Sequence, residues 1–81
     1  MFYVYLLKNN SQRWYIGVTN NLKRRLAEHN SKQNFSTKYD PSWKIIYYEA
    51  YTNEVVAKER ENQLKNFGSA FGHLMKRLGL K

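Results

Sequence analysis

Apolar and aromatic residues form two short runs near the start of the chain. Residues 2–7 and 13–18 are rich in aromatic and branched side chains, and the intervening Asn9-Asn10-Ser11 is typical of a turn. The pattern therefore predicts a β-hairpin whose loop is longer than a two-residue turn.

A helical period follows the hairpin. Leu22, Leu26 and His29 recur at i, i+4 and i+7, which places them on one face of a helix from about residue 20 to residue 30. A polar residue at positions 19–21 can cap this helix, because its side chain can accept a hydrogen bond from a free amide of the first turn.

The second half of the chain predicts one more strand and two more helices. Residues 43–51 carry apolar side chains on both faces, which indicates a third strand at the centre of the sheet. A second helix should run from after Thr52 or Asn53 to about Phe67, with Gly68 in a left-handed C-terminal position. Ser69 should then cap a shorter third helix.

These elements predict an α+β fold in which a three-stranded mixed β-sheet is flanked by three helices, in the order β-β-α-β-α-α. The length of 81 residues fits a single domain, 1–81, with a modest core, and excludes a second domain. The four glycines are scattered along the chain, which argues against a glycine-rich phosphate loop.

Charge narrows the partner class. Fourteen lysines and arginines against six acidic residues give a formal net charge of +8, which favours nucleic acid, although ribosomal proteins and binders of anionic membranes share such a charge. The absence of cysteine excludes disulfides, thiolate zinc sites and cysteine nucleophiles. No apolar run reaches about 18 residues, so we expect neither a membrane span nor a signal peptide, and a cytoplasmic location.

Two tyrosines of the predicted hairpin are candidates for chemistry. Tyr5 and Tyr15 come from neighbouring strands, so both phenols can lie on one face of the sheet and point at a common place. Tyr5 would need a nearby cation or a metal-bound water to act as a base, because a free phenol has a pKa of about 10. The alternative is that both are ordinary half-buried strand tyrosines.

Arg25 and His29 lie four residues apart beside the apolar stripe of the first helix. A guanidinium drawn toward the sheet requires an anionic partner, and a phosphate bound through two hydrogen bonds would supply one. An ion pair of Arg25 with Glu28 or Glu61 is equally compatible with the sequence, and His29 could instead be a capping or packing residue.

Glu61 shares a helical face with Ala57 and Leu64, which should pack inward. A carboxylate there is costly unless it is paired or bound to a metal, and magnesium is commonly held by one or two protein oxygens together with waters. Lys65, one turn later, could neutralise Glu61 instead, whereas Glu59 is expected on the solvated side.

Together these residues resemble the GIY-YIG nuclease domain in its short, single-domain form, and they are similar to the N-terminal catalytic domain of an excision-repair nuclease. Tyr3-Val4-Tyr5 corresponds to the first tripeptide of the family name, with Tyr and Val replacing its glycine and isoleucine, and Tyr15-Ile16-Gly17 matches the second. Residues 57–65 are similar to the helix that carries the family's glutamate, which aligns best with Glu61.

The resemblance implies an endonuclease that hydrolyses DNA phosphodiesters with one Mg²⁺ or Mn²⁺ ion, in DNA repair or processing. It implies that Glu61 is the metal ligand, that Tyr5 is the general base and that Tyr15 forms a hydrogen bond with the water or the phosphate. Arg25 would stabilise charge on the phosphoryl oxygens, and His29 would orient groups or assist proton transfer. Gly17 would let backbone and substrate approach closely.

Basic residues are expected to contact the nucleic acid, which we expect to be DNA. The protein is expected to be a monomer, and the sequence is also compatible with a protein partner. The basic residues are Lys23, Arg24, Lys32, Lys38 and Lys65, and the stretch 31–42 is expected to be an exposed, substrate-contacting loop. Two alternatives fit the sequence: a nucleic-acid-binding module without turnover, and a small subunit that docks through an apolar stripe on its last helix, including Phe71 and Leu78.

Overall fold

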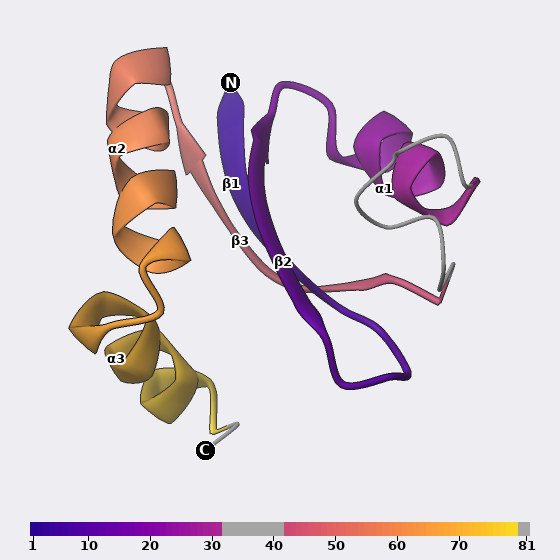
Figure 1. Cartoon of the computed structure of the whole chain (residues 1–81). Helices are drawn as coiled ribbons and strands as arrows, with labels where there is room; N and C mark the ends of the chain where they lie inside the picture. Colours follow the sequence, from indigo (N-terminus) through magenta and orange to yellow (C-terminus); the bar gives the residue numbers. More distant parts are fainter. Residues whose placement is uncertain (32–41, 80–81) are drawn as a thin grey trace.

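The computed structural model describes residues 1–31 and 42–79 of the chain. Within them, three strands and three helices follow the predicted β-β-α-β-α-α order, which confirms the α+β class. The elements are β1 (Phe2–Lys8), β2 (Trp14–Thr19), α1 (Leu22–Asn30), β3 (Lys44–Tyr51), α2 (Glu54–Lys65) and α3 (Ser69–Leu78). Figure 1 shows α2 and α3 on one side of the sheet and α1 on the other.

The sheet of the described residues is antiparallel, with the strand order β2-β1-β3. The expected mixed sheet is therefore wrong in this detail, because both neighbours of β1 run opposite to it. The expectation that β3 would be the central strand is also wrong, since β1 is central and residues 4–7 of it are all buried. β3 alternates between exposed and half-buried residues, because tyrosine rings supply much of its apolar content and can keep their polar ends in water. Tyr48, for example, is 52% exposed.

Two apolar clusters hold the helices to opposite faces of the sheet. Because strand side chains alternate in direction, Tyr5 faces α1, whereas Val4 and Leu6 face α2. The cluster on the α1 side is built around Tyr5, Leu7 and Trp43, with Leu22 and Leu26 packed against it. The larger cluster, on the side of α2 and α3, consists of Val4, Leu6, Ile16, Ala57, Leu64, Leu74 and Met75.

Asparagine side chains fix the starts of α1 and α2. Asn21 Oδ1 accepts a hydrogen bond from the backbone N–H of Arg24 at 3.0 Å, and Asn53 Oδ1 accepts one from the N–H of Val55 at 2.8 Å. Each bond satisfies an amide that has no partner within its helix. The start of α1 in turn sets which of its residues face the sheet.

The junction between α2 and α3 differs from the prediction. Phe67, not Gly68, takes the left-handed conformation, with φ of 52°. Gly68 is the N-cap of α3, and Ser69 is the first helical residue rather than the cap. The ring of Phe67 packs on Phe71 with 4.7 Å between centroids, which helps to offset the cost of a left-handed residue that is not glycine.

The apolar stripe of α3 belongs to the core. Leu74 and Met75 are buried, and Phe71 and Leu78 pack against the same cluster. The apolar stripe of α3 is therefore covered by the rest of the chain. It is not free to dock onto another protein, as the small-subunit alternative required. In residues 1–31 and 42–79, no helix combines the length and the apolar character that crossing a bilayer demands.

Candidate active site

Tyr5 lies in the middle of the central strand and passes directly across Gly17, its register partner on β2. A Cβ atom at position 17 would stand 2.5 Å from Oη and 2.8 Å from Cζ of Tyr5. Any side chain there would displace the phenol, so glycine is needed for this close approach. The structure therefore shows that Gly17 makes room for the side chain of Tyr5, where the resemblance implied close approach of a substrate.

Helix α1 places Arg25 and His29 beside the hydroxyl of Tyr5. Arg25 Nε donates to Tyr5 Oη at 3.2 Å, and Tyr5 Oη lies 3.1 Å from His29 Nε2. Because the guanidinium can only donate, the hydroxyl donates its own proton to His29, whose imidazole then carries its proton on Nδ1. The three side chains form one hydrogen-bonded chain, which we name the Arg25–Tyr5–His29 relay.

Burial sets the protonation states along this relay. Tyr5 is 2% exposed and His29 is fully buried. Burial raises the pKa of Tyr5 to about 12, although the hydrogen bond from Arg25 opposes the rise. Burial, with the nearby charge of Arg25, lowers the pKa of His29 to about 4. At neutral pH the phenol therefore keeps its proton, and the imidazole is neutral and able to accept one.

Tyr15, on β2, packs its ring against two members of the Arg25–Tyr5–His29 relay. Its ring stacks on that of Tyr5 with 6.3 Å between centroids and meets the imidazole of His29 edge-on at 4.4 Å. Both phenols share the α1 face of the sheet, as predicted. Tyr5 is buried and Tyr15 is half-buried, as expected of ordinary strand tyrosines. A role in packing and a role in chemistry are therefore compatible for both.

Arg25 also makes one of the ion pairs that the sequence left open. Its Nη1 lies 2.9 Å from Glu28 Oε1, while the described residues contain no ion pair between Arg25 and Glu61. Arg24 approaches the same Glu28 carboxylate at 3.7 Å. With Nε on the phenol and Nη1 on a carboxylate, the guanidinium of Arg25 is fixed in orientation, and the hydrogen bond to Tyr5 raises its pKa further.

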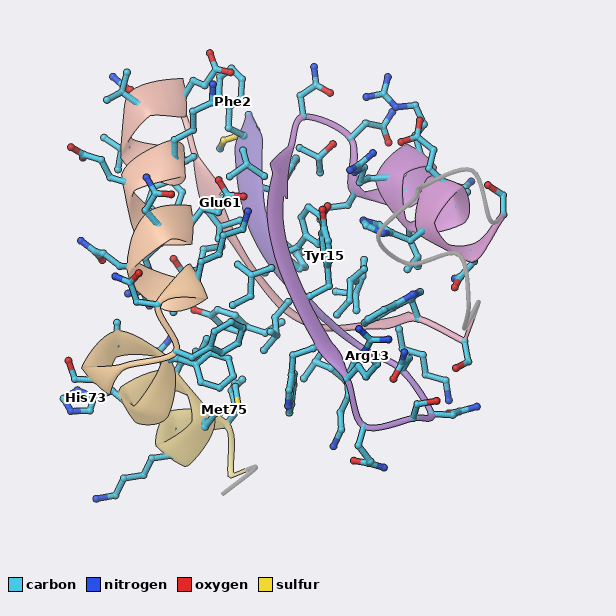
Figure 2. All side chains as sticks on the ribbon, viewed as in Figure 1. Phe2, Arg13, Tyr15, Glu61, His73 and Met75 are labelled. Carbon is cyan, nitrogen blue, oxygen red and sulfur yellow. The ribbon has the colours of Figure 1, made fainter. Side chains whose placement is uncertain are left out.

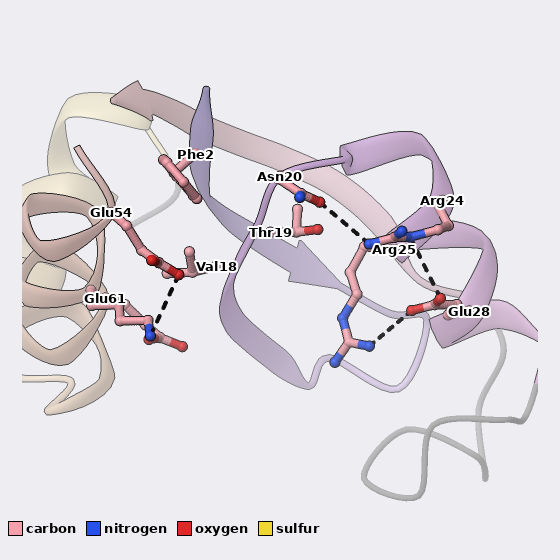
Figure 3. A pocket seen from close by; sticks show the side chains of 10 residues that line it. Phe2, Val18, Thr19, Asn20, Arg24, Arg25, Glu28, Glu54 and Glu61 are labelled. Atoms are coloured by element: carbon pink, nitrogen blue, oxygen red, sulfur yellow. Dashed lines mark hydrogen bonds and ion pairs between the residues drawn. The ribbon is translucent and has the colours of Figure 1, made fainter. Parts of the chain in front are cut away.

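A cleft of about 400 Å³ opens beside the relay, across the edge of β2. Figure 3 shows Arg24, Arg25 and Glu28 on its α1 wall and Glu54 and Glu61 on its α2 wall. The cleft brings Arg25 and Glu61 to the same space from separate segments, as the resemblance implies. We name it the Arg25–Glu61 cleft.

Glu61 points from α2 toward the sheet (Figure 2) and its side chain is 18% exposed. Its Oε2 lies 3.0 Å from Lys65 Nζ, so the alternative pairing with Lys65 is present. After burial and the effects of the nearer groups, the charge of Glu61 makes a smaller contribution that also raises the pKa of Tyr5. The carboxylate and the phenol therefore interact electrostatically.

The remaining candidate residues are distributed around the site. Lys23 and Glu59 are exposed, whereas Lys32 and Lys38 lie in 32–41, outside the described residues. Sequence reasoning did not assign Glu54 to the site. The spacing along the helix could have identified it, because Glu54 precedes Glu61 by seven residues, or two turns, and therefore lies on the same helical face.

The donors of the cleft fit a hard, hydrated cation. The described residues contain no group of three or more His, Cys, Asp or Glu side chains arranged to hold a metal ion. Glu61 nevertheless offers one carboxylate at an open cleft, and Mg²⁺ keeps several waters while taking one or two carboxylates and substrate phosphates. Such an ion would be held by Glu61 together with water and substrate.

Known proteins match this chain in sequence and in fold. Residues 1–73 match the GIY-YIG catalytic domain. A UPF0213 protein of Clostridium perfringens is 37% identical over 68 residues, covering 80% of this chain and 71% of that protein. A UPF0213 protein of Pediococcus acidilactici is 34% identical over 90 residues, covering 89% and 92%.

The solution NMR structure of a UPF0213 protein from Bacillus halodurans shares the fold. It is 24% identical in sequence and superposes with a TM-score of 0.58 over 96% of this chain and 85% of that one. GIY-YIG domains are nuclease domains, which implies that they bind nucleic acid and generally depend on a metal. On the match over residues 1–73, this chain belongs to the GIY-YIG family.

Proposed function

We propose that this chain is a DNA endonuclease that hydrolyses phosphodiester bonds with one Mg²⁺ or Mn²⁺ ion. The observation that carries the proposal is the Arg25–Tyr5–His29 relay beside a cleft whose opposite wall bears Glu61. A guanidinium for the phosphate, a phenol linked to a neutral base and a carboxylate are the groups that such a hydrolysis uses.

Tyr5 would take the proton of the attacking water. With a pKa of about 12, Tyr5 does not accumulate as phenolate at neutral pH. It can accept a proton on Oη only as its own proton passes to His29 Nε2, 3.1 Å away. The water O–H bond breaks, the phenol is regenerated and His29 becomes the imidazolium, so one proton moves from water to His29. Arg25 Nε offsets negative charge that develops on Oη during the transfer.

Arg25 would stabilise the charge that grows on the phosphoryl oxygens. Its side chain is 30% exposed at the cleft, and Nη1 faces Glu28, so a substrate phosphate would compete with Glu28 for the guanidinium. Tyr15, stacked on Tyr5, would hydrogen-bond the water or the phosphate. Glu28 thus holds Arg25 in orientation until substrate binds.

Glu61 would hold the divalent ion in exchange for its present partner Lys65. When bound, the ion supplies polarisation of the phosphate and stabilisation of the leaving oxygen. Lys65, once released, would be able to contact the nucleic acid. The other candidate contacts are Lys23, Arg24, Lys32 and Lys38.

A cleavage assay tests the proposal. Purified protein is incubated with branched, nicked and single-stranded DNA in Mg²⁺ or in EDTA, and we expect products only with Mg²⁺. Glu61→Gln keeps the size of the side chain but removes its charge, so it should abolish cleavage. Glu59→Gln is the matched control, because Glu59 is exposed on the same helix. No products from any DNA, or equal cleavage by Glu61→Gln and wild type, would contradict the proposal.

A nucleic-acid-binding module without turnover is the second candidate, and one observation favours it. Arg25 and Glu61 each have an ion-pair partner within the chain, Glu28 and Lys65, so both are engaged in the absence of substrate. Such a module would bind DNA without metal-dependent products and act as a small subunit in DNA repair or processing. We propose either activity for a cytoplasmic monomer, and light scattering at several concentrations measures the oligomeric state.

A further inference from the structure

The Arg25–Glu61 cleft carries no net charge of its own. Three of its lining side chains are cationic and three are carboxylates: Arg24, Arg25 and Lys58 against Glu28, Glu54 and Glu61. The chain as a whole has a formal charge of +8, so the excess lies on other surfaces. A polyanion is therefore attracted mainly by those surfaces, since attraction to phosphate depends on uncompensated positive charge.

Helix α3 is one place where positive charge is not compensated. The sequence contains no aspartate or glutamate after Glu61. Lys76 and Arg77 occupy the last turn of α3, where cations also complement the helix dipole. A polyanion that approaches this helix meets no carboxylate on it.

A second cleft, of about 310 Å³, lies between α2 and α3. It is lined by Arg60, Ala70, His73, Leu74 and Arg77, so two guanidiniums and an imidazole meet there beside two apolar side chains. Figure 2 shows His73 on the outer side of α3. We name this space the Arg60–Arg77 cleft.

Side chains of β3 hold both guanidiniums in place. Arg60 Nε and Nη2 donate to the Glu49 carboxylate at 2.9 and 3.0 Å. Arg77 Nη2 donates to Tyr47 Oη at 2.7 Å, and its guanidinium lies 5.7 Å from the centre of the Tyr47 ring. Glu49 also accepts hydrogen bonds from the hydroxyls of Tyr47 and Tyr51. The oxygens of Glu49 are therefore already engaged, and the two guanidiniums are oriented before any ligand arrives.

Donors of both guanidiniums stay available to a ligand. In the described part of the chain, Nη1 of Arg60 and Nη1 of Arg77 have no hydrogen-bond partner. The carboxylate of Glu49 pairs with Arg60, and no carboxylate of the described residues pairs with Arg77, so the group has an excess of one positive charge apart from His73. A phosphate group, with several acceptor oxygens and a negative charge, matches these donors in geometry and sign.

We propose that the Arg60–Arg77 cleft binds a backbone phosphate of the nucleic acid, away from the phosphodiester that would be cleaved. The proposal rests on the proposed function in that its ligand is a polynucleotide. Arg77 is the main anchor, because Arg60 is shared with Glu49. His73 adds a hydrogen-bonding group at the rim.

The two clefts lie on opposite sides of α2. Arg60 bonds to Glu49 on β3, whereas its neighbour Glu61 shares a cleft with Val18 and Thr19 of β2, and β2 and β3 are the two edges of the sheet. A helix with its side chains is about 10–12 Å across, so one nucleic acid that occupies both clefts has to extend over α2. We therefore expect a DNA that is long enough to cross α2 to bind more tightly than a dinucleotide. Part of this gain in affinity should depend on Arg77.

Binding of a labelled DNA oligonucleotide, measured by fluorescence anisotropy in EDTA over a range of salt concentrations, tests the second site. Arg77→Gln should weaken binding roughly fivefold to tenfold at low salt and reduce the slope of log affinity against log salt by about 0.7–0.9, the loss of one phosphate contact. Lys76→Gln is the matched control, because it removes the same charge from the same turn but does not line the cleft. It should lose only the general attraction of one surface charge, and so weaken binding and reduce the slope by less than Arg77→Gln does.

A second variant and a fold measurement complete the test. His73→Gln changes an exposed side chain and should weaken binding by less than Arg77→Gln, and thermal unfolding verifies that each variant is folded. Equal effects of Arg77→Gln and Lys76→Gln, or no effect of either, would overturn the second site. Cleavage by the wild type alongside that result would leave the proposed function standing, whereas a wild type that binds no DNA would overturn both.

Discussion

The two clefts on either side of α2 differ in charge and in burial. The Arg25–Glu61 cleft is lined by as many carboxylates as cations and adjoins a buried phenol and imidazole. The Arg60–Arg77 cleft has more cations than carboxylates and an exposed histidine at its rim. A balanced cleft suits the movement of a proton between neutral groups, and an unbalanced one suits the capture of a polyanion. Chemistry and affinity can therefore be assigned to different surfaces of one small domain.

A single helix serves both clefts because of its geometry. Consecutive residues of an α-helix point about 100° apart, so Arg60 reaches the β3 edge while Glu61 reaches the β2 edge. The same helix also packs Ala57 and Leu64 into the core. Any motion of α2 relative to the sheet would therefore alter both clefts together, whereas single substitutions should separate them.

The largest expected effect is on turnover and comes from Arg25. Arg25→Gln removes the donor to Tyr5 and the charge that would face the phosphate, so we expect single-turnover cleavage to fall by about 10³-fold. DNA affinity should fall by less than about tenfold, since one cation is lost from a balanced cleft. Arg13→Gln, which removes an exposed arginine of the hairpin loop, is the control. If affinity and turnover fell equally, the separation of the two clefts would be refuted.

A smaller loss of turnover should follow from removing one oxygen of the relay. Tyr5→Phe keeps the ring across Gly17 but leaves Arg25 Nε and His29 Nε2 without their common partner. We expect cleavage to fall by about 10²-fold, within the range of general-base contributions, with little change in DNA binding. Tyr3→Phe, on the same strand, should cleave at the wild-type rate. Wild-type cleavage by Tyr5→Phe would exclude the relay as the proton acceptor.

The sequence predicts the two clefts unequally. The shared side of Arg25 and His29 and the inward face of Glu61 follow from helical spacing, which fixes direction locally. The Arg60–Arg77 cleft could not be predicted in this way, because it depends on α3 packing beside α2 and on Glu49 of β3. These contacts join segments that are distant in sequence, so the spacing of apolar residues within one helix or strand cannot predict them.

The sequence also did not predict the strand order or the conformation of the α2–α3 junction, for related reasons. Composition did not distinguish β1, which is buried over residues 4–7, from β3, because an aromatic residue such as Tyr48 contributes apolar character whether or not it is covered. Turn chemistry favoured Gly68 for the left-handed position, but the tertiary contact between Phe67 and Phe71 prevailed. Local rules were wrong where packing between elements decided the outcome.

Tight packing at Gly17 should make the Arg25–Glu61 cleft sensitive to one methyl group. Gly17→Ala places a Cβ within 2.5 Å of Tyr5 Oη, so we expect the free energy of unfolding to fall by about 1–3 kcal/mol, with loss of cleavage as the phenol is displaced. Gly72→Ala is the control beside the other cleft, because an added Cβ there meets nothing within 4 Å. It should gain up to about 1 kcal/mol from helix propensity. Urea unfolding measures both, and unchanged stability in Gly17→Ala would mean that Tyr5 moves aside freely.

The smallest effect concerns His29, the buried imidazole of the relay beside the Arg25–Glu61 cleft. Burial, with the charge of Arg25, lowers the pKa of His29 to about 4 from its ordinary 6.5. Between these values the unfolded chain binds more protons than the folded one, so stability rises with pH and is lost as pH falls through the window, by up to about 1.4 kcal/mol per pH unit. Above the window both states are unprotonated, and the slope from His29 vanishes.

Urea unfolding at a series of pH values isolates this contribution. His29→Gln should flatten the slope between about pH 4.5 and 6.5, because glutamine does not titrate. Burial would raise the pKa of Glu49, but the hydrogen bonds from Arg60 and the tyrosine hydroxyls lower it below its usual 4.5. Stability from Glu49 is therefore lost mainly as pH falls below about 4.5, under the range of pH 4.5–6.5 in which His29→Gln is compared with wild type. If His29→Gln kept the wild-type slope, His29 would not be a buried neutral base, and the Arg25–Glu61 cleft would lose the proton acceptor that distinguishes it from its neighbour.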